Sequence, residues 1–236
     1  MNEIQKALLD LARSKCLPHL MSLDELSSYA DRIAFVLVGS VATGLCRKDS
    51  DIDMALVCEK DVYKVISQNR PWQVGRPSET TIEGVQLHYY GITFDEIEAK
   101  LKALDDVSLY VYSHALVLYD IHNSYEERFA GLLSHIPVIR KRRLEGKLDM
   151  LLRRSRALRS CFDEGDIITI ARVALELITL SLKVIALLDD VPFDPRKRLF
   201  KTALSGNLGR RLAPDMRQLF CVIGNLGNFR DDPETK

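Results

Sequence analysis

The sequence has no excess of either charge, because its 33 Lys and Arg residues balance its 33 Asp and Glu residues. A chain without net positive charge lacks the overall field that draws extended nucleic acids to basic proteins, so we expect no such partner. Its five cysteines are odd in number and include no Cys-x-x-Cys pair. This pattern favours reduced thiols, as in a cytoplasmic protein.

The sequence also lacks a long, uninterrupted apolar run. The most apolar stretch, around residues 173–188, contains Glu176 and Lys183 and is too broken to span a bilayer. Near the start of the chain, Arg13 and Lys15 interrupt the apolar residues where a secretory signal would need its hydrophobic region. We therefore expect no membrane segment and a cytoplasmic location.

The composition is that of a globular protein, with 47% apolar and 28% charged residues in a chain of 236. This length can form one large domain or two small ones. Helical spacing at the start of the chain and in two later segments predicts helices around a sheet. The two later helices are expected at residues 23–32 and 94–104. Apolar or alternating patterns predict strands at residues 35–38, 52–57, 85–90 and 115–119.

The second half of the chain has a different pattern. After about Ile136 the strand signals stop and long helical patterns begin, of which residues 167–188 are the most apolar. We therefore predict an α+β protein with two domains. A mixed β-sheet domain flanked by helices occupies residues 1–135, and a helical bundle occupies 136–236. Many basic residues between positions 140 and 159 form either a solvated helix face or a contact for a nucleotide or an acidic partner.

The segment from Gly39 to Asp53 carries the strongest chemical signal. The first predicted strand ends at Gly39 and Ser40, where a missing side chain and a hydroxyl suit the close approach of a triphosphate. Asp51 and Asp53 stand two residues apart on the next strand, so both carboxylates point to one face and can bind the same divalent ions. Asp53 lies among apolar residues, where a carboxylate is costly unless a cation or donor satisfies it. The pattern predicts phosphoryl-type chemistry that depends on Mg²⁺.

Other interpretations of this segment are weaker. A P-loop would require Gly-Lys-Ser/Thr where Gly44-Leu45-Cys46 stands, and no G-x-G-x-x-G dinucleotide motif is present. A plain turn, in which the glycines only reverse the chain, does not explain why Asp53 places a carboxylate in an apolar strand.

The pattern resembles the nucleotidyltransferase superfamily that includes polymerase beta and the aminoglycoside nucleotidyltransferases. The resemblance consists of an apolar strand, Gly39-Ser40, the ten residues 41–50, and then Asp51-Ile52-Asp53. It covers residues 35–57 directly and extends more weakly to about residue 120. It implies that Gly39 and Ser40 hold a nucleoside triphosphate and that Asp51 and Asp53 bind two Mg²⁺ ions. Members of this kind often carry a C-terminal helical domain that helps to bind the acceptor, which is similar to the predicted bundle.

The sequence departs from the family pattern at the third carboxylate, which normally lies on the strand predicted here at residues 85–90. His88 is nearest to that position, and we predict it as the third metal ligand. Glu83, just before the strand, is an alternative that could reach inward. If His88 replaces a carboxylate, the second ion loses charge compensation and catalysis is weak, altered or absent.

Two further residues are candidates for the site. Glu176 stands alone among apolar neighbours on a predicted helix, and it is either the general base for the acceptor hydroxyl or an ordinary surface residue. Relatives that modify aminoglycosides use a glutamate of their helical domain in this way. Lys48, with Arg47 between the turn and the aspartates, is either a triphosphate ligand or a solvated loop residue.

Our leading hypothesis is an enzyme that transfers a nucleoside monophosphate to a small hydroxylated acceptor, of which an antibiotic is one example, and releases pyrophosphate. ATP is the expected nucleotide, although the sequence does not identify the base. One alternative is an antitoxin-like enzyme that transfers AMP to a protein. Another is a nucleotide-binding module that turns over weakly or not at all. The sequence leaves the oligomeric state open.

Overall fold

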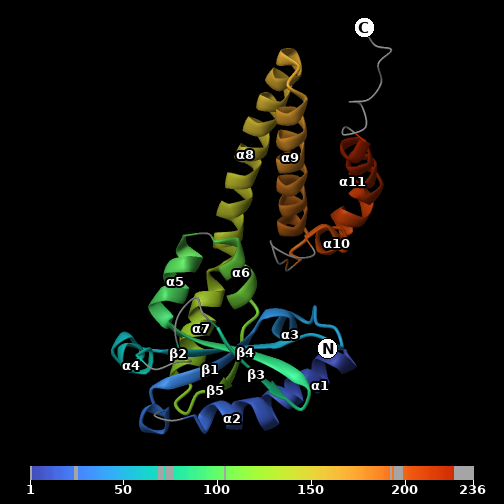
Figure 1. Cartoon of the computed structure of the whole chain (residues 1–236). Helices are drawn as coiled ribbons and strands as arrows, with labels where there is room; N and C mark the ends of the chain where they lie inside the picture. The colour runs from blue at the N-terminus through green and yellow to red at the C-terminus, as the bar shows by residue number, and fades with distance from the viewer. Residues whose placement is uncertain are drawn as a thin grey trace. The chain divides into compact units, whose positions relative to one another are not determined.

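A computed structural model describes residues 2–23, 26–68, 72, 77–103, 105–191, 193 and 199–225. The chain forms two compact units, Met1–Pro137 and Val138–Lys236 (Figure 1). The first contains a sheet with helices, and the second is helical. The predicted α+β class with a helical C-terminal region is therefore confirmed. That the units act as separate functional domains, as the predicted division after residue 135 implies, stays a prediction.

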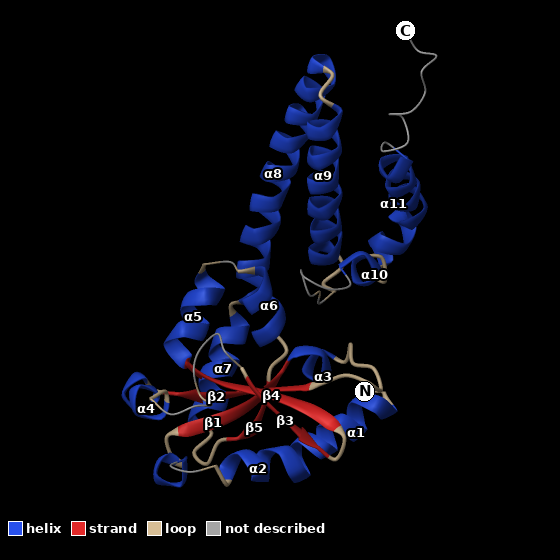
Figure 2. Cartoon of the chain, viewed as in Figure 1, coloured by secondary structure: helices blue, strands red, loops and turns tan. Residues whose placement is uncertain are grey.

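The sheet of the first unit has five strands in the order β3-β4-β2-β1-β5 (Figure 2). The neighbours β2 and β4 run parallel, whereas the other three pairs are antiparallel, so the sheet is mixed as predicted. The strands are β1 Ile33–Val38, β2 Ile52–Cys58, β3 Ser78–Ile82, β4 Val85–Thr93 and β5 Leu116–Tyr119.

The central strands form because their apolar runs can be buried on both faces. Every residue of β1 is buried, as are all residues of β2 except Asp53. On one face Phe35 packs edge-on against Trp72, with ring centroids 6.1 Å apart, and Trp72 packs in the same way on Tyr89. The N-terminal helices cover this face (Figure 1). Asp53 therefore belongs to the opposite face.

Helices of the first unit begin and end where local side chains satisfy their backbone. The strand β4 ends at Thr93, whose hydroxyl accepts the N–H of Glu96 while the Glu96 carboxylate accepts the N–H of Thr93. This capping box starts α5 directly from the strand. The helices of this unit are α1 Glu3–Leu11, the π-helix η1 Ala12–Cys16, α2 Leu17–Met21, the 3-10 helix η2 Leu26–Tyr29, α3 Gly39–Thr43, α4 Lys60–Ile66, α5 Phe94–Lys102, α6 Asp106–Tyr112 and α7 Ser124–Ser134.

Two local features differ from the sequence predictions. The helix predicted at residues 23–32 is only the short η2, with Asp24 and Glu25 outside the described residues. The edge strand β3 was not predicted, because its sequence Ser-Glu-Thr-Thr-Ile is polar and half exposed. An edge strand needs only one hydrogen-bonded neighbour and little burial, so it carries a weak hydrophobic signal.

The second unit contains most of α8 Ile136–Glu164, together with α9 Ile167–Leu188, α10 Leu199–Ala203 and α11 Asn207–Asn225. Its core joins α9 to the last two helices through Ile178, Leu182 and Met216. The carboxylate of Asp189, directly after α9, accepts the N–H groups of Leu208 and Gly209 at 2.9 and 2.8 Å. These bonds lower the pKa of Asp189 and join the end of α9 to the start of α11.

No helix in the described part of the chain combines the length and the apolar character that crossing a membrane requires.

Candidate functional site

Strand register brings three polar side chains together at one end of the sheet. Val38, the last residue of β1, pairs with Asp53 on β2, and Asp53 pairs with His88 on the parallel strand β4. Paired residues on neighbouring strands point to the same face, and so do residues two apart on one strand. Asp51 directly precedes β2, and its carboxylate lies in the same group.

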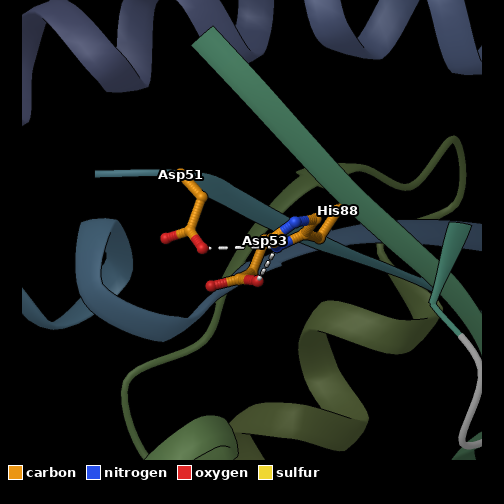
Figure 3. A group of neighbouring side chains, drawn as sticks. All are labelled: Asp51, Asp53 and His88. Atoms are coloured by element: carbon orange, nitrogen blue, oxygen red, sulfur yellow. Dashed lines mark ion pairs between the residues drawn. The ribbon is translucent and has the colours of Figure 1, made fainter. Parts of the chain in front are cut away.

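The three side chains converge on a small volume (Figure 3). The Nδ1 atom of His88 lies 3.3 Å from Oδ2 of Asp51 and 3.5 Å from Oδ1 of Asp53. One ligand atom from each residue lies within 4.8 Å of the other two. All three side chains are partly exposed, with 39%, 32% and 26% of Asp51, Asp53 and His88 accessible. The group is therefore open to an ion and to a substrate.

The donor set fits a divalent metal ion. Two carboxylates directed at one point repel each other unless a cation lies between them. Carboxylate oxygens suit hard divalent ions, and an imidazole nitrogen adds a ligand that first-row transition ions accept. The residues present therefore fit a metal, which the three could bind together.

The turn after β1 lies directly beside this group. Gly39 has φ +72°, a conformation that L-residues rarely adopt, and a Cβ built on it would lie 3.2 Å from Cγ of Asp53 and overlap the carboxylate. The hydroxyl of Thr43 donates to the carbonyls of Gly39 and Ser40, which fixes the turn. A glycine is thus required here by both conformation and space.

Ser40 supplies the feature that best fits a phosphate. Its Oγ is buried and has no hydrogen-bond partner among the described residues. A buried hydroxyl without a hydrogen-bond partner destabilises the folded protein, and a ligand oxygen that accepts its hydrogen bond removes this cost. The turn is joined to the N-terminal helix by Gln5, whose Nε2 donates to the carbonyl of Val41 at 2.9 Å. The backbone next to Ser40 is therefore tied to the N-terminal helix, and the Ser40 hydroxyl can still donate a hydrogen bond.

The loop between α3 and β2 places the remaining basic candidate. A tight turn, in which the Ser50 N–H donates to the Arg47 carbonyl and the Arg47 N–H donates to Oγ of Ser50, leads the chain into Asp51. Lys48 lies in this turn and is exposed. Its contact with a triphosphate stays a prediction.

Glu176 belongs to the helical unit, where two guanidinium groups engage it. Its Oε2 lies 3.0 Å from Nε of Arg154 on α8, and its Oε1 accepts a hydrogen bond of 3.0 Å from Arg172 on α9. The side chain is 34% exposed. The pair with Arg154 joins α8 to α9, and the role of Glu176 as a base stays a prediction.

The sequence offered Glu83 as an alternative ligand, whereas the structure brings Glu79 to the group. Glu83 lies in the β3–β4 turn at φ +50° and forms an ion pair of 3.4 Å with Lys15. Glu79, on β3, pairs in register with His88, and its Oε2 lies 3.7 Å from Nε2 of that ring. The sequence reasoning missed Glu79 because it missed β3. The signal available was the β-branched run Thr80-Thr81-Ile82, with Gly84 two residues after it, where a hairpin turn can form.

Tyr90 is a second residue near the group that the sequence reasoning missed. It follows His88 by two positions on β4 and therefore points to the same face. Its hydroxyl lies 3.1 Å from that of Tyr112. Burial raises the pKa of Tyr90, and the negative charge of Asp53 adds to the increase. The phenol therefore stays neutral beside the carboxylates.

The sequence from residue 21 to residue 145 matches the family model of the nucleotidyltransferase domain. This match covers more than half of the chain and includes the turn, both aspartates and His88. The chain belongs to this nucleotidyltransferase family. It is therefore an enzyme of nucleotidyl transfer, as the sequence analysis predicted.

This nucleotidyltransferase was also compared with curated protein sequences and with solved structures. No curated protein matches its sequence. A nucleotidyltransferase-like protein from Exiguobacterium sibiricum, solved by crystallography, shares 10% sequence identity with it at a TM-score of 0.47. That similarity covers 88% of this chain and 75% of the other.

Proposed function

We propose that the protein transfers a nucleoside monophosphate from a nucleoside triphosphate, with ATP as the expected donor, to a hydroxylated small molecule, and that pyrophosphate leaves. The observation that carries this proposal is the convergence of Asp51, Asp53 and His88 beside the turn at Gly39 and Ser40. The family supplies the reaction type. An antibiotic is one acceptor of the proposed class.

Each residue of the group has a proposed role. Asp51, Asp53 and His88 would hold divalent ions, of which Mg²⁺ is the one that the sequence predicts. Such ions neutralise phosphate oxygens and stabilise the charge that develops as the acceptor oxygen displaces pyrophosphate. Gly39 lets the triphosphate approach the backbone, and the buried hydroxyl of Ser40 donates to a phosphate oxygen. Lys48 would neutralise part of the triphosphate charge from the exposed loop.

The direct assay is release of pyrophosphate from each of the common nucleoside triphosphates in the presence of a panel of hydroxylated acceptors and a divalent ion. We expect release that requires both the ion and an acceptor. Release of inorganic phosphate alone, or transfer of the terminal phosphate, would contradict the proposal.

A second candidate is a nucleotide-binding module with little turnover, and one observation favours it. The group offers two carboxylates and an imidazole, so it supplies less negative charge to the ions than three carboxylates would. Calorimetry separates the two candidates. Tight, metal-dependent nucleotide binding without pyrophosphate release across broad acceptor panels would favour the module.

A fragment that ends near residue 135 tests the proposal that the first domain binds the nucleotide and the helical domain binds the acceptor. It keeps all five strands and the residues proposed to bind the nucleotide. We expect it to retain the circular dichroism of the mixed sheet and to bind a non-hydrolysable nucleotide, but to lose acceptor binding. Nucleotide binding serves as the internal control, and unchanged acceptor affinity by calorimetry would show that the helical unit does not bind the acceptor.

Replacing Glu176 by Gln tests its proposed role as the base. If its carboxylate accepts the acceptor proton, we expect kcat to fall about a hundredfold or more, with little change in KM. Arg172→Gln is the control, because it breaks one of the two ion pairs of Glu176 and keeps the carboxylate. That control should change stability by less than about 1 kcal/mol. Equal effects of the two variants on turnover would assign Glu176 a structural role only.

A further inference from the structure

The His88 ring has two nitrogens that face different surroundings. Nδ1 faces the two aspartates, at 3.3 Å from Asp51 and 3.5 Å from Asp53. Nε2 faces Glu79, whose Oε2 is 3.7 Å away on the neighbouring edge strand. A neutral imidazole carries its proton on one nitrogen and a lone pair on the other. An acceptor at one nitrogen keeps the proton there and leaves the lone pair of the other nitrogen for a metal.

The position of Glu79 is set by the hairpin of β3 and β4. Register places Glu79 directly opposite His88, and the neighbouring Gln86 donates from Nε2 to Oε2 of Glu79 at 3.0 Å. The same oxygen therefore lies between an amide donor and the ring nitrogen. Histidines that bind metals usually donate their second N–H to such an oxygen, which fixes the tautomer and strengthens the ligand.

We propose that Glu79 is a positioning residue that accepts the Nε2–H of His88, so that Nδ1 completes with Asp51 and Asp53 a site that prefers Mn²⁺ to Mg²⁺. This inference rests on the proposed function of the same site. The 3.7 Å separation is longer than a hydrogen bond. A ligated imidazole is a stronger donor, and the Glu79 side chain is 68% exposed and has room to approach it.

The metal preference follows from the donor atoms. Mg²⁺ takes oxygen ligands and accepts nitrogen poorly, whereas a first-row transition ion such as Mn²⁺ accepts carboxylate oxygens, phosphate oxygens and imidazole nitrogen. A site with an oriented imidazole in place of a third carboxylate therefore shifts selectivity toward Mn²⁺. Glu79 also adds a negative charge near the ring without contacting the ion itself.

The test is a titration of the full-length protein with Mn²⁺, followed by electron paramagnetic resonance without nucleotide, with competition by Mg²⁺. We expect nitrogen coupling to bound Mn²⁺ in the wild type. Glu79→Gln should weaken Mn²⁺ binding about 10- to 100-fold. Glu83→Gln is the matched control, because it removes the same charge from the adjacent turn and should leave Mn²⁺ affinity unchanged. Thermal unfolding of each variant verifies the fold.

His88→Asp is the second variant. It should abolish the nitrogen coupling and tighten Mg²⁺ binding, because an oxygen ligand replaces nitrogen. Bound Mn²⁺ without nitrogen coupling in the wild type would overturn the inference, as would unchanged Mn²⁺ affinity in Glu79→Gln. Pyrophosphate release by the wild type is measured in a separate assay, which tests the proposed function. Nitrogen coupling without any release would reject the proposed function alone, and release without coupling would reject this inference alone.

Discussion

Replacing either Asp51 or Asp53 by Asn is expected to abolish metal-dependent turnover and to leave the protein folded. The two carboxylates point into one small volume with Nδ1 of His88 within 3.5 Å of each. An amide keeps the shape of the side chain but removes the negative charge that holds a divalent ion. Loss of an ion that contributes about 4 kcal/mol to transition-state stabilisation lowers the rate roughly a thousandfold.

The control for this prediction is Asp49→Asn. Asp49 lies in the same loop, is exposed, and loses the same charge in the variant. It should keep its turnover within a few-fold, since exposed single charges contribute little. Circular dichroism should show all three variants folded, because the site is partly exposed and removing one carboxylate relieves repulsion between two. Full activity in either site variant would remove the assignment of the aspartates as metal ligands.

Replacing Gly39 by Ala is the second change with a large expected effect. The backbone at φ +72° costs an L-residue about 1–2 kcal/mol, and the added Cβ would overlap the carboxylate of Asp53. Either the turn or the aspartate must move. Because displacement of a catalytic group by about 1 Å can cost a hundredfold in rate, we expect turnover to fall by about that factor and thermal stability to decrease as well.

Gly44 offers a matched control, because its φ of +75° carries the same backbone cost without contact with the metal group. The three atoms nearest to a Cβ there belong to the side chain of Gln5, at 3.3 Å or more. Gly44→Ala should therefore lose about the same stability in thermal unfolding and keep most of its turnover. If both variants lose turnover equally, backbone strain accounts for the effect, and the close approach of Gly39 to Asp53 has no catalytic role.

The parts of the fold that depend on burial could be predicted from the sequence. Apart from Asp53, the strands β1 and β2 consist of apolar residues buried on both faces, and α9 coincides with the predicted helix at residues 167–188. Their hydrophobic patterns are strong because these elements form the core. The motif at Gly39, Asp51 and Asp53 was visible for a related reason, since a carboxylate within a buried strand is costly without a partner.

The side-chain contacts that depend on strand register, or on the polar edge strand β3, could not be predicted from the sequence. Whether His88 faces the aspartates depends on the parallel pairing of β2 and β4, and no local pattern specifies which strands become neighbours. Glu79 was missed because β3 is a polar edge strand with little burial. The pairing of Glu176 with Arg154 depends on how α8 packs against α9, which helical periodicity alone does not determine.

The most direct test of the central claim is a crystal structure of the protein with a divalent ion and a non-hydrolysable nucleoside triphosphate. Our account predicts ions held by Asp51 and Asp53, with Nδ1 of His88 as a further ligand. It also predicts phosphate oxygens against the backbone of Gly39 and the hydroxyl of Ser40. A nucleotide bound elsewhere, or bound at this turn with no ion at the two aspartates, would contradict the account.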